Sequence, residues 1–317
     1  MTGATIGINL FSQASTWPEF LDAATRVERL GYESLWTWDH LHAIVGEPQQ
    51  PIFEGYVTLG AWAAATERIK IGLMVGANTF RNPGLVVKSI TTLDHVSNGR
   101  AILGIGGAWF GYEHTAHGID FGSGFGQRLD WLDEAVAAMR DLLDGKTVTS
   151  APGGRYQFND LHHVPDPVQA HVPIMIGGTG KQKTLKTVAR YADQWNGAGT
   201  PELLGECVEV LAEHCRTVGR DPAAIQKTSN IWVIIRDDPA EARRVWNETM
   251  AHNQKAVDEG MIAELRPILG PPSVVAARLN EYAAAGVPHH IVEVPAPYDV
   301  ETLERLAVEV RPLLQDA

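Results

Sequence analysis

The sequence is short of cysteine, of positive charge and of long apolar runs. Its 317 residues include two cysteines, and 26 Lys and Arg stand against 38 Asp and Glu, for a formal net charge of −12. A nucleic-acid backbone requires a basic surface, so this balance argues against such a partner. No apolar run approaches the roughly 18 residues of a membrane span, and no signal-peptide pattern is present. We therefore expect a cytoplasmic protein that binds neither nucleic acid nor membrane.

Several common reaction centres also lack their sequence patterns. Cys207 and Cys215 fall in one expected helix, which puts them about 12 Å apart, too far for a disulfide, so both are expected to be free thiols. Two adjacent histidine pairs have no Cys or Asp at zinc-ligand spacing, and no metal site is expected. A Gly-x-Ser-x-Gly elbow and a Walker loop are missing. Residues 103–109 do not fit a dinucleotide fingerprint, because Trp109 stands at its third glycine position.

What the sequence contains is an alternation of short apolar runs with longer amphipathic segments. The runs that read as strands are residues 5–10, 34–38, 69–75, 100–106, 172–176, 193–196, 228–236 and 289–294. Each connection is long enough to join parallel strands, so eight βα units predict an α/β fold, a (β/α)8 TIM barrel.

No internal repeat or composition break divides the chain, so residues 1–317 are expected to form a single domain. Two segments extend the connections at the strand C-terminal ends. Residues of about 145–171 form an excursion before the fifth strand, and residues of about 237–271 form an insertion between the seventh and eighth strands. Within the insertion, one helix is expected from Asp238 to about Ile262.

A barrel of this kind binds its ligands just after the strand C-terminal ends. Small and polar residues dominate at these positions, which suits a large planar, phosphorylated cofactor. The candidates for cofactor contact are Asp39, Val75, Gly76, Ala77, Asn78, Gly106, Gly107, Trp109, Gly177, Gly178, Thr179, Gly180 and Lys181. The alternative is a rim crowded with glycines that binds nothing.

The segment after the fifth strand is the candidate phosphate site. Glycines at 177, 178 and 180 let backbone amides approach an anion at the start of a helix expected from about Lys181. Lys181, Lys183, Lys186 and Arg190 form the densest basic cluster in an acidic sequence. We expect Lys181 to lie nearest the phosphate, with the others on the surface. A tight strand-to-helix turn with solvated lysines is the alternative interpretation.

Two residues are candidates for proton transfer. His40 directly follows the second strand, where a neighbouring hydrogen bond would hold its ring. Glu113 lies among aromatic residues, an environment that suits a carboxyl acting as an acid. A structural histidine is the alternative for His40. The alternatives for Glu113 are ion pairs with Arg81, Arg100 or Arg128.

Several motifs, taken in order, make the sequence resemble the bacterial luciferase-like flavin-dependent oxidoreductases, and most closely their actinobacterial deazaflavin-dependent branch. The resemblance extends from Thr5 to about Gly199 and is weaker beyond. The motifs are Trp38-Asp-His-Leu41, Thr79-Phe-Arg-Asn-Pro83, Leu93-Asp-His-Val-Ser-Asn-Gly-Arg100, Leu103-Gly-Ile-Gly-Gly-Ala-Trp109, Glu113-His114 and Pro173-Ile-Met-Ile-Gly-Gly178.

This resemblance implies a barrel whose cofactor lies across the strand C-termini, with its phosphate in the loop from Gly177 to Lys181. It implies a cis non-proline peptide behind the ring, at Met74–Val75 or Val75–Gly76. It also assigns His40 as the active-site histidine, Asp39 as the acid that contacts the ring, and Glu113 as an acid near the substrate.

The implied activity is an oxidoreductase that moves a hydride between coenzyme F420 and a small organic substrate. One alternative is an FMN-dependent monooxygenase that uses O₂ and a separate reductase. Another is a flavin-binding protein without catalysis. Relatives usually dimerise, so a homodimer is expected, with the helix at 56–65 and the helix from Leu85 as its candidate surface.

Overall fold

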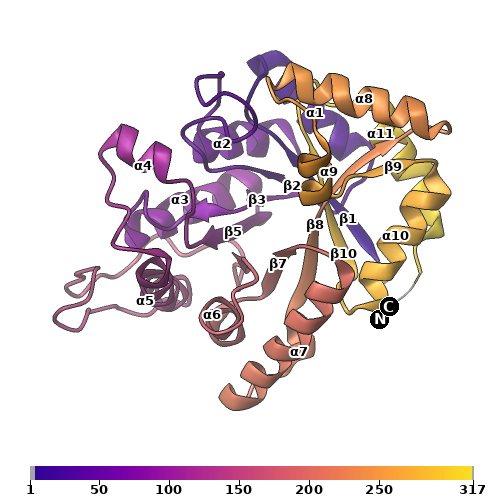
Figure 1. The fold of residues 1–317 in the computed structure, drawn as a ribbon. Helices are drawn as coiled ribbons and strands as arrows, with labels where there is room; N and C mark the ends of the chain where they lie inside the picture. The colour runs from indigo at the N-terminus through magenta and orange to yellow at the C-terminus, as the bar shows by residue number, and fades with distance from the viewer. Residues whose placement is uncertain (1–3, 316–317) are drawn as a thin grey trace.

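The computed structural model describes residues 4–315 and shows eight parallel strands closed into a barrel, with helices packed around its outside (Figure 1). The strands of the barrel are β1 (Thr5–Leu10), β2 (Ser34–Thr37), β3 (Lys70–Leu73), β5 (Ala101–Gly106), β6 (Ile174–Gly177), β7 (Gln194–Ala198), β8 (Gln226–Ile235) and β10 (His289–Val294). The barrel closes because β10 pairs with both β8 and β1. The predicted (β/α)8 TIM barrel is confirmed.

Two short strands extend this barrel. The third strand was expected to reach Val75, but β3 ends at Leu73, and the chain rejoins the sheet as β4 (Gly76–Ala77), which pairs with β5. Between these strands the peptide from Met74 to Val75 is cis, which confirms the expectation drawn from the resemblance. The other addition, β9 (Ile268–Gly270), pairs with β8.

The surrounding helices begin where the sequence offers caps. At Thr16 a capping box with Glu19 starts α1, and the side chain of Asn82 accepts a hydrogen bond from Gly84 N at the start of α3. The helices that follow the strands are α1 (Trp17–Arg29), α2 (Gly55–Ala65), α3 (Pro83–Ser97), α5 (Phe125–Leu143), α6 (Thr184–Tyr191), α7 (Pro201–Val218), α10 (Pro272–Ala284) and α11 (Val300–Arg305). Within residues 4–315 no helix is both long and apolar enough to cross a membrane.

Two helix predictions were wrong in extent, and one helix was not predicted. The single helix expected from Asp238 to Ile262 is two helices, α8 (Pro239–His252) and α9 (Glu259–Leu265). They separate because Asn253 turns inward, where its buried amide donates to the carbonyl of Ala296 at 2.8 Å. The loop at 107–126 contains an unpredicted helix, α4 (Gly111–His117). Helix α6 starts at Thr184 instead of Lys181.

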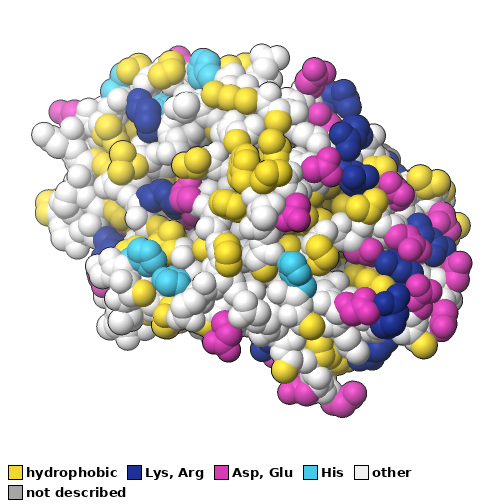
Figure 2. All heavy atoms as spheres, turned by 90° about the horizontal axis from the view of Figure 1, so that it is seen from above, with side chains coloured by type: hydrophobic (Ala, Val, Ile, Leu, Met, Phe, Trp, Pro, Cys, Tyr) yellow, Lys and Arg dark blue, Asp and Glu magenta, His cyan; other side chains and the backbone are white. Residues whose placement is uncertain are grey.

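The helices bury their inner faces against the barrel, and several, such as α8 and α11, expose charged outer faces, whereas α2 contains no charged residue. The main apolar cluster joins the strands to the helices, with Phe20, Trp62 and Leu211 fully buried. Figure 2 shows charged side chains of both signs gathered at the right of the view, the side on which α8, α10 and α11 lie in Figure 1. There Arg244 pairs with Glu248 and Arg305 with Glu309, each at 2.7 Å. Exposed pairs of this kind contribute little to stability.

The barrel is tightest where β5 passes the end of β3. A Cβ atom on Gly104 would overlap the carbonyl oxygen of Leu73, which belongs to the backbone and has no rotamer to give way. We predict that Gly104→Ala lowers the free energy of unfolding by about 2–4 kcal/mol, the range of a severe core overlap. Urea unfolding followed by circular dichroism measures the change.

Gly60 in α2 is the matched control, because a Cβ there would meet nothing within 4 Å. Gly60→Ala should raise the free energy of unfolding by about 0.5–1 kcal/mol through the higher helix propensity of alanine. Equal stability of Gly104→Ala and the wild type would contradict the close approach of β3 and β5.

Candidate functional site

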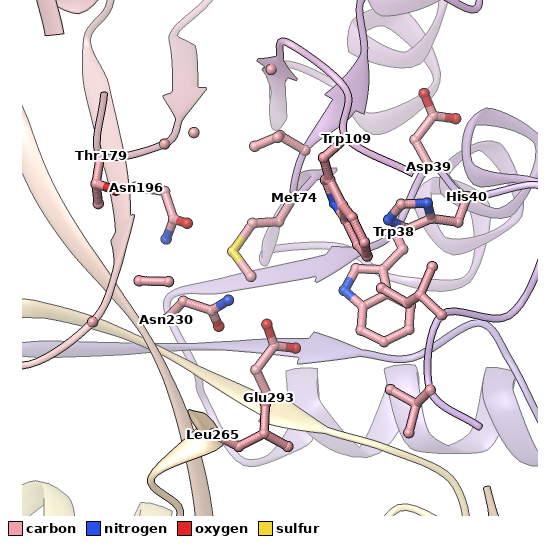
Figure 3. Close-up of a pocket in the computed structure, with 18 of the residues that line it drawn as sticks. Trp38, Asp39, His40, Met74, Trp109, Thr179, Asn196, Asn230, Leu265 and Glu293 are labelled. Atoms are coloured by element: carbon pink, nitrogen blue, oxygen red, sulfur yellow. The ribbon is translucent and has the colours of Figure 1, made fainter. Parts of the chain in front are cut away.

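A cavity of ≈ 600 Å³ opens at the C-terminal end of the barrel strands. This volume is typical of small-molecule and cofactor sites. Most of the candidate residues line it: Asp39, His40, Val75, Gly76, Ala77, Gly106, Gly107, Trp109, Glu113, Gly177, Gly178 and Thr179. Figure 3 shows Trp109 and His40 on one side of this cavity and Thr179 and Asn196 on the other.

Three candidates do not line the cavity. Asn78 is buried, and its amide donates to the hydroxyl of Tyr156 at 3.1 Å. Gly180 packs against Thr184, which leaves no room for a side chain. The ammonium group of Lys181 is exposed and donates to Glu206 on α7 at 2.7 Å. Lys181 therefore does not line the cavity in this structure, and its contact with a cofactor phosphate stays a prediction.

The other basic residues of this segment lie on the surface, as expected. Lys183 pairs with Asp130 at 2.6 Å, and Arg190 pairs with Asp133 at 3.0 Å. Both carboxylates belong to α5. The wall of the cavity at this point is consequently the backbone from Gly177 to Thr179 rather than a lysine cluster.

His40 and Glu113 form a hydrogen-bonded pair in the wall of the cavity. Nδ1 of His40 lies 3.0 Å from Oε1 and 3.2 Å from Oε2 of Glu113, and the backbone N–H of Leu41 donates to Oε2 at 2.9 Å. The side chain of Glu113 is 1% exposed and that of His40 14%. The pairing of Glu113 with an arginine, considered from the sequence, is wrong.

This arrangement orients the imidazole ring. Because Nδ1 is engaged by Glu113, Nε2 is the ring nitrogen left for a molecule in the cavity, and it has no hydrogen-bond partner among residues 4–315. The rings of Trp109 and Trp38 lie with centroids 5.6 and 6.0 Å from the imidazole and limit its rotation. A histidine backed by a carboxylate in this way can accept or donate a proton at a fixed position.

Asp39 plays a different part from its neighbour His40. Its carboxylate accepts two hydrogen bonds from the guanidinium of Arg81, at 2.7 and 2.9 Å, and one from the N–H of Ala77 at 2.9 Å. Burial raises the pKa of the Asp39 carboxyl, while Arg81 and the Ala77 amide act in the opposite direction. The group therefore anchors β4 to the loop after β2 and does not hold the ring of His40.

The back wall of the cavity is formed by Val75 between two glycines. A Cβ atom on Gly106 would lie 2.7 Å from the Val75 side chain, and one on Gly177 would lie 3.0 Å from it. Larger residues at either position would push Val75 out of place. The glycines thus keep this wall smooth enough for a planar group to lie against the valine.

Sequence reasoning missed several residues of the cavity. Met74, Asn230, Trp232 and Glu293 line it, and Lys255, Met261, Leu265 and Arg266 reach it from the segment around α9. A signal existed for Glu293, which stands between Val292 and Val294 in an apolar run, because a polar residue in a buried strand needs a partner or a function. Asn230 follows the polar residues Thr228 and Ser229 and does not stand out in the sequence. The segment around α9 carried no such signal.

Glu293 is the most unusual of these residues. Its side chain lies in β10 and is 3% exposed, and the amide nitrogen of Asn9 donates to its Oε2 at 2.6 Å. Burial raises the pKa of the Glu293 carboxyl to about 8, although the amides of Asn9 and Asn230 act to lower it. No cluster of three or more His, Cys, Asp or Glu side chains suited to a metal ion occurs in the described part of the chain.

Known proteins share this architecture and part of the sequence. An F420-dependent glucose-6-phosphate dehydrogenase of Kineococcus radiotolerans is 28% identical over 320 residues, covering 93% of this chain and 92% of that protein. The structure of an F420-dependent secondary alcohol dehydrogenase in complex with an F420-acetone adduct superimposes with a TM-score of 0.84 at 22% identity, covering 99% of this chain and 100% of that one.

A third likeness comes from a flavin enzyme. The oxygenating constituent of 3,6-diketocamphane monooxygenase from Pseudomonas putida, in complex with FMN, superimposes with a TM-score of 0.77 at 18% identity, covering 100% of both chains. The two structural likenesses establish the fold. Residues 4–289 match the family described as luciferase-like monooxygenase. Because this match spans most of the chain, the protein belongs to the luciferase-like monooxygenase family.

Proposed function

We propose that the protein is an oxidoreductase that transfers a hydride between coenzyme F420 and a small organic substrate. The observation that carries the proposal is the His40–Glu113 pair, which presents Nε2 of a fixed imidazole to a cavity at the strand C-terminal ends. Coenzyme F420 would supply or accept the hydride when bound. His40 would supply or remove the proton that accompanies it at the substrate, with Glu113 stabilising the protonated ring.

The walls of the cavity fit a large planar cofactor. Val75, flanked by Gly106 and Gly177, offers a smooth apolar surface for a ring system. The turn at Gly178 and Thr179 has the small residues that a phosphate group needs for close backbone approach. We assign these residues to cofactor binding. Lys181 would take part only after release from Glu206.

The choice of F420 over FMN rests on the relatives. The F420-dependent glucose-6-phosphate dehydrogenase aligns over nearly the full length of both chains. The likeness to the FMN-bound monooxygenase is one of fold alone, at 18% identity. An FMN-dependent monooxygenase using O₂ and a separate reductase is therefore the second candidate.

The first prediction from this proposal is that the purified protein binds F420 at micromolar concentration and binds FMN at least about tenfold more weakly, a difference of about 1.4 kcal/mol. Quenching of cofactor fluorescence in parallel titrations measures both affinities. The matched variant is Gly177→Val, whose added side chain would displace Val75 and weaken binding of either cofactor. Tighter binding of FMN, together with FMN-dependent O₂ consumption, would favour the monooxygenase.

A second prediction separates catalysis from binding. His40→Asn and Glu113→Gln should each lower kcat about 10²–10⁴-fold, the contribution typical of acid–base catalysis, while the Kd for F420 changes little. Reduction of F420 with a secondary alcohol and with glucose 6-phosphate provides the assay. His42→Asn is the control, because His42 bonds to the carbonyl of Pro48 and does not line the cavity.

The outcome against catalysis is equally clear. If His40→Asn and Glu113→Gln bind F420 normally and their turnover rates equal that of the wild type, the protein is a cofactor-binding protein without acid–base catalysis at this site.

The expected cytoplasmic location also stays a prediction.

For the assembly we propose a homodimer through the outer surfaces of α2 and α3. Val57 is 75% exposed and Leu85 62% exposed, and the two helices that carry them pack side by side. Val57→Glu combined with Leu85→Glu should halve the mass measured by light scattering. Val308→Glu, at a valine outside these helices that is 69% exposed, is the control and should leave the mass unchanged. A monomeric wild type would contradict the proposal.

A further inference from the structure

Glu293 is a buried titratable group in the cavity that is separate from the His40–Glu113 pair. The residue lies on β10, between β1 and β8, and its side chain is 3% exposed. Figure 3 shows its carboxyl group directed into the cavity between Asn230 and Trp38. A carboxyl that lines a cavity and is buried to this degree needs a partner for each oxygen or a neutral form.

The immediate neighbours of this carboxyl are amides without charge. The nitrogen of Asn9 donates to Oε2 of Glu293 at 2.6 Å, and Asn230 lies on the other side. The side-chain oxygens of Asn9 and Asn230 are both buried and have no donor among residues 4–315. A carboxylate can only accept hydrogen bonds, whereas a protonated carboxyl has one O–H donor, which an acceptor oxygen of a molecule in the cavity can use.

Among residues 4–315 no cation forms a hydrogen bond or an ion pair with Glu293. On β1 and β8, the strands that pair with β10, the polar neighbours are the neutral amides of Asn9 and Asn230. The titratable or charged groups on the remaining cavity walls are Asp39, His40, Glu113, Lys255, Glu264, Arg266 and Tyr282. The raised pKa of Glu293, about 8, agrees with this environment.

We propose that Glu293 is a protonated acid that donates a hydrogen bond to a carbonyl-type oxygen of the molecule bound in the cavity. This proposal rests on the proposed function, because it requires that a ligand binds in this cavity. Two sources offer the same acceptor: the carbonyl edge of the cofactor ring, and the carbonyl or hydroxyl oxygen of the substrate. Glu293 thus selects for ligands with an oxygen acceptor at the floor of the site.

The proposal has a pH consequence of definite sign. Loss of the proton removes the donor and sets a negative charge against the acceptor oxygen, so ligand affinity falls as the pH rises past the pKa of the carboxyl. Each pH unit above that point should weaken binding by at most about tenfold, because only the protonated fraction binds. Below that point the affinity should not depend on this group.

The protonation state is tested first in the ligand-free protein. Carbon-13 NMR of protein labelled at the glutamate carboxyl should show one carboxyl that titrates near pH 8 and that is missing from Glu293→Gln. Glu264→Gln is the control, because Glu264 lines the same cavity but is exposed to solvent. A Glu293 carboxyl that titrates near the ordinary glutamate value would overturn the proposal, whatever the protein binds.

The donor role is tested by affinity across the same pH range. Dissociation constants for F420 and for FMN, and KM for the substrate, are measured for the wild type, Glu293→Gln and Glu293→Met. Glutamine has the size of glutamate and keeps a hydrogen-bond donor, but it cannot ionise. The ligand affinity of Glu293→Gln should therefore not decline at high pH. Methionine has no donor and should bind about three- to tenfold more weakly at every pH.

The cofactor Kd and the substrate KM together identify which molecule carries the oxygen that accepts the hydrogen bond from Glu293. A pH-dependent cofactor Kd places the hydrogen bond on the ring, and a pH-dependent KM alone places it on the substrate. Titration of the free ligands cancels in the comparison of wild type with Glu293→Gln. If all three proteins show parallel pH profiles in both arms, the donor role is overturned. Failure to bind F420 would instead contradict the proposed function, and the NMR titration would still decide the state of Glu293.

Discussion

The close approach of three strands around Val75 is the constraint on which the site depends. After Leu73 the third strand leaves the sheet, and the carbonyl of Leu73 can approach β5 closely because residue 104 has no side chain. Gly106 and Gly177 then flank the valine that projects toward the cavity. A barrel of regular strands would fill this space with alternating side chains, as small barrels do. Because the glycines have no side chains, the wall of the cavity is smooth here and a ligand can contact the backbone directly.

Three buried carboxyl groups lie around this cavity, and each is accommodated differently. Asp39 is matched by the guanidinium of Arg81, which ties the β2 loop to β4. Glu113 pairs with His40, which carries a positive charge only when its imidazole ring is protonated. Glu293 has only amides beside it, and burial then favours its neutral form. An uncompensated buried charge costs several kcal/mol, so the available partner determines whether a carboxyl anchors, supports proton transfer or stays protonated.

The sequence predicted the barrel and most of the cavity because both arise from local patterns. Strand and helix periods indicate eight βα units, and the residue after each strand end must face the site. What escaped prediction depends on contacts between distant segments. Lys181 pairs with Glu206 on another helix, and the break after α8 follows from the inward turn of Asn253. Nothing in the neighbourhood of Glu113 indicated that its partner would be His40, which is 73 residues away.

His40 and Glu293 differ in their access to water, and this difference suits them to different tasks. A group that supplies a proton in each turnover must recover it from solvent, which a side chain at the exposed edge of a site can do. His40, at 14% exposure, meets this requirement, and Nε2 is its unengaged atom. Glu293, at 3%, lies on the floor between two amides. Its proton is better suited to a lasting hydrogen bond that orients a ligand, because a fixed donor needs no exchange with solvent.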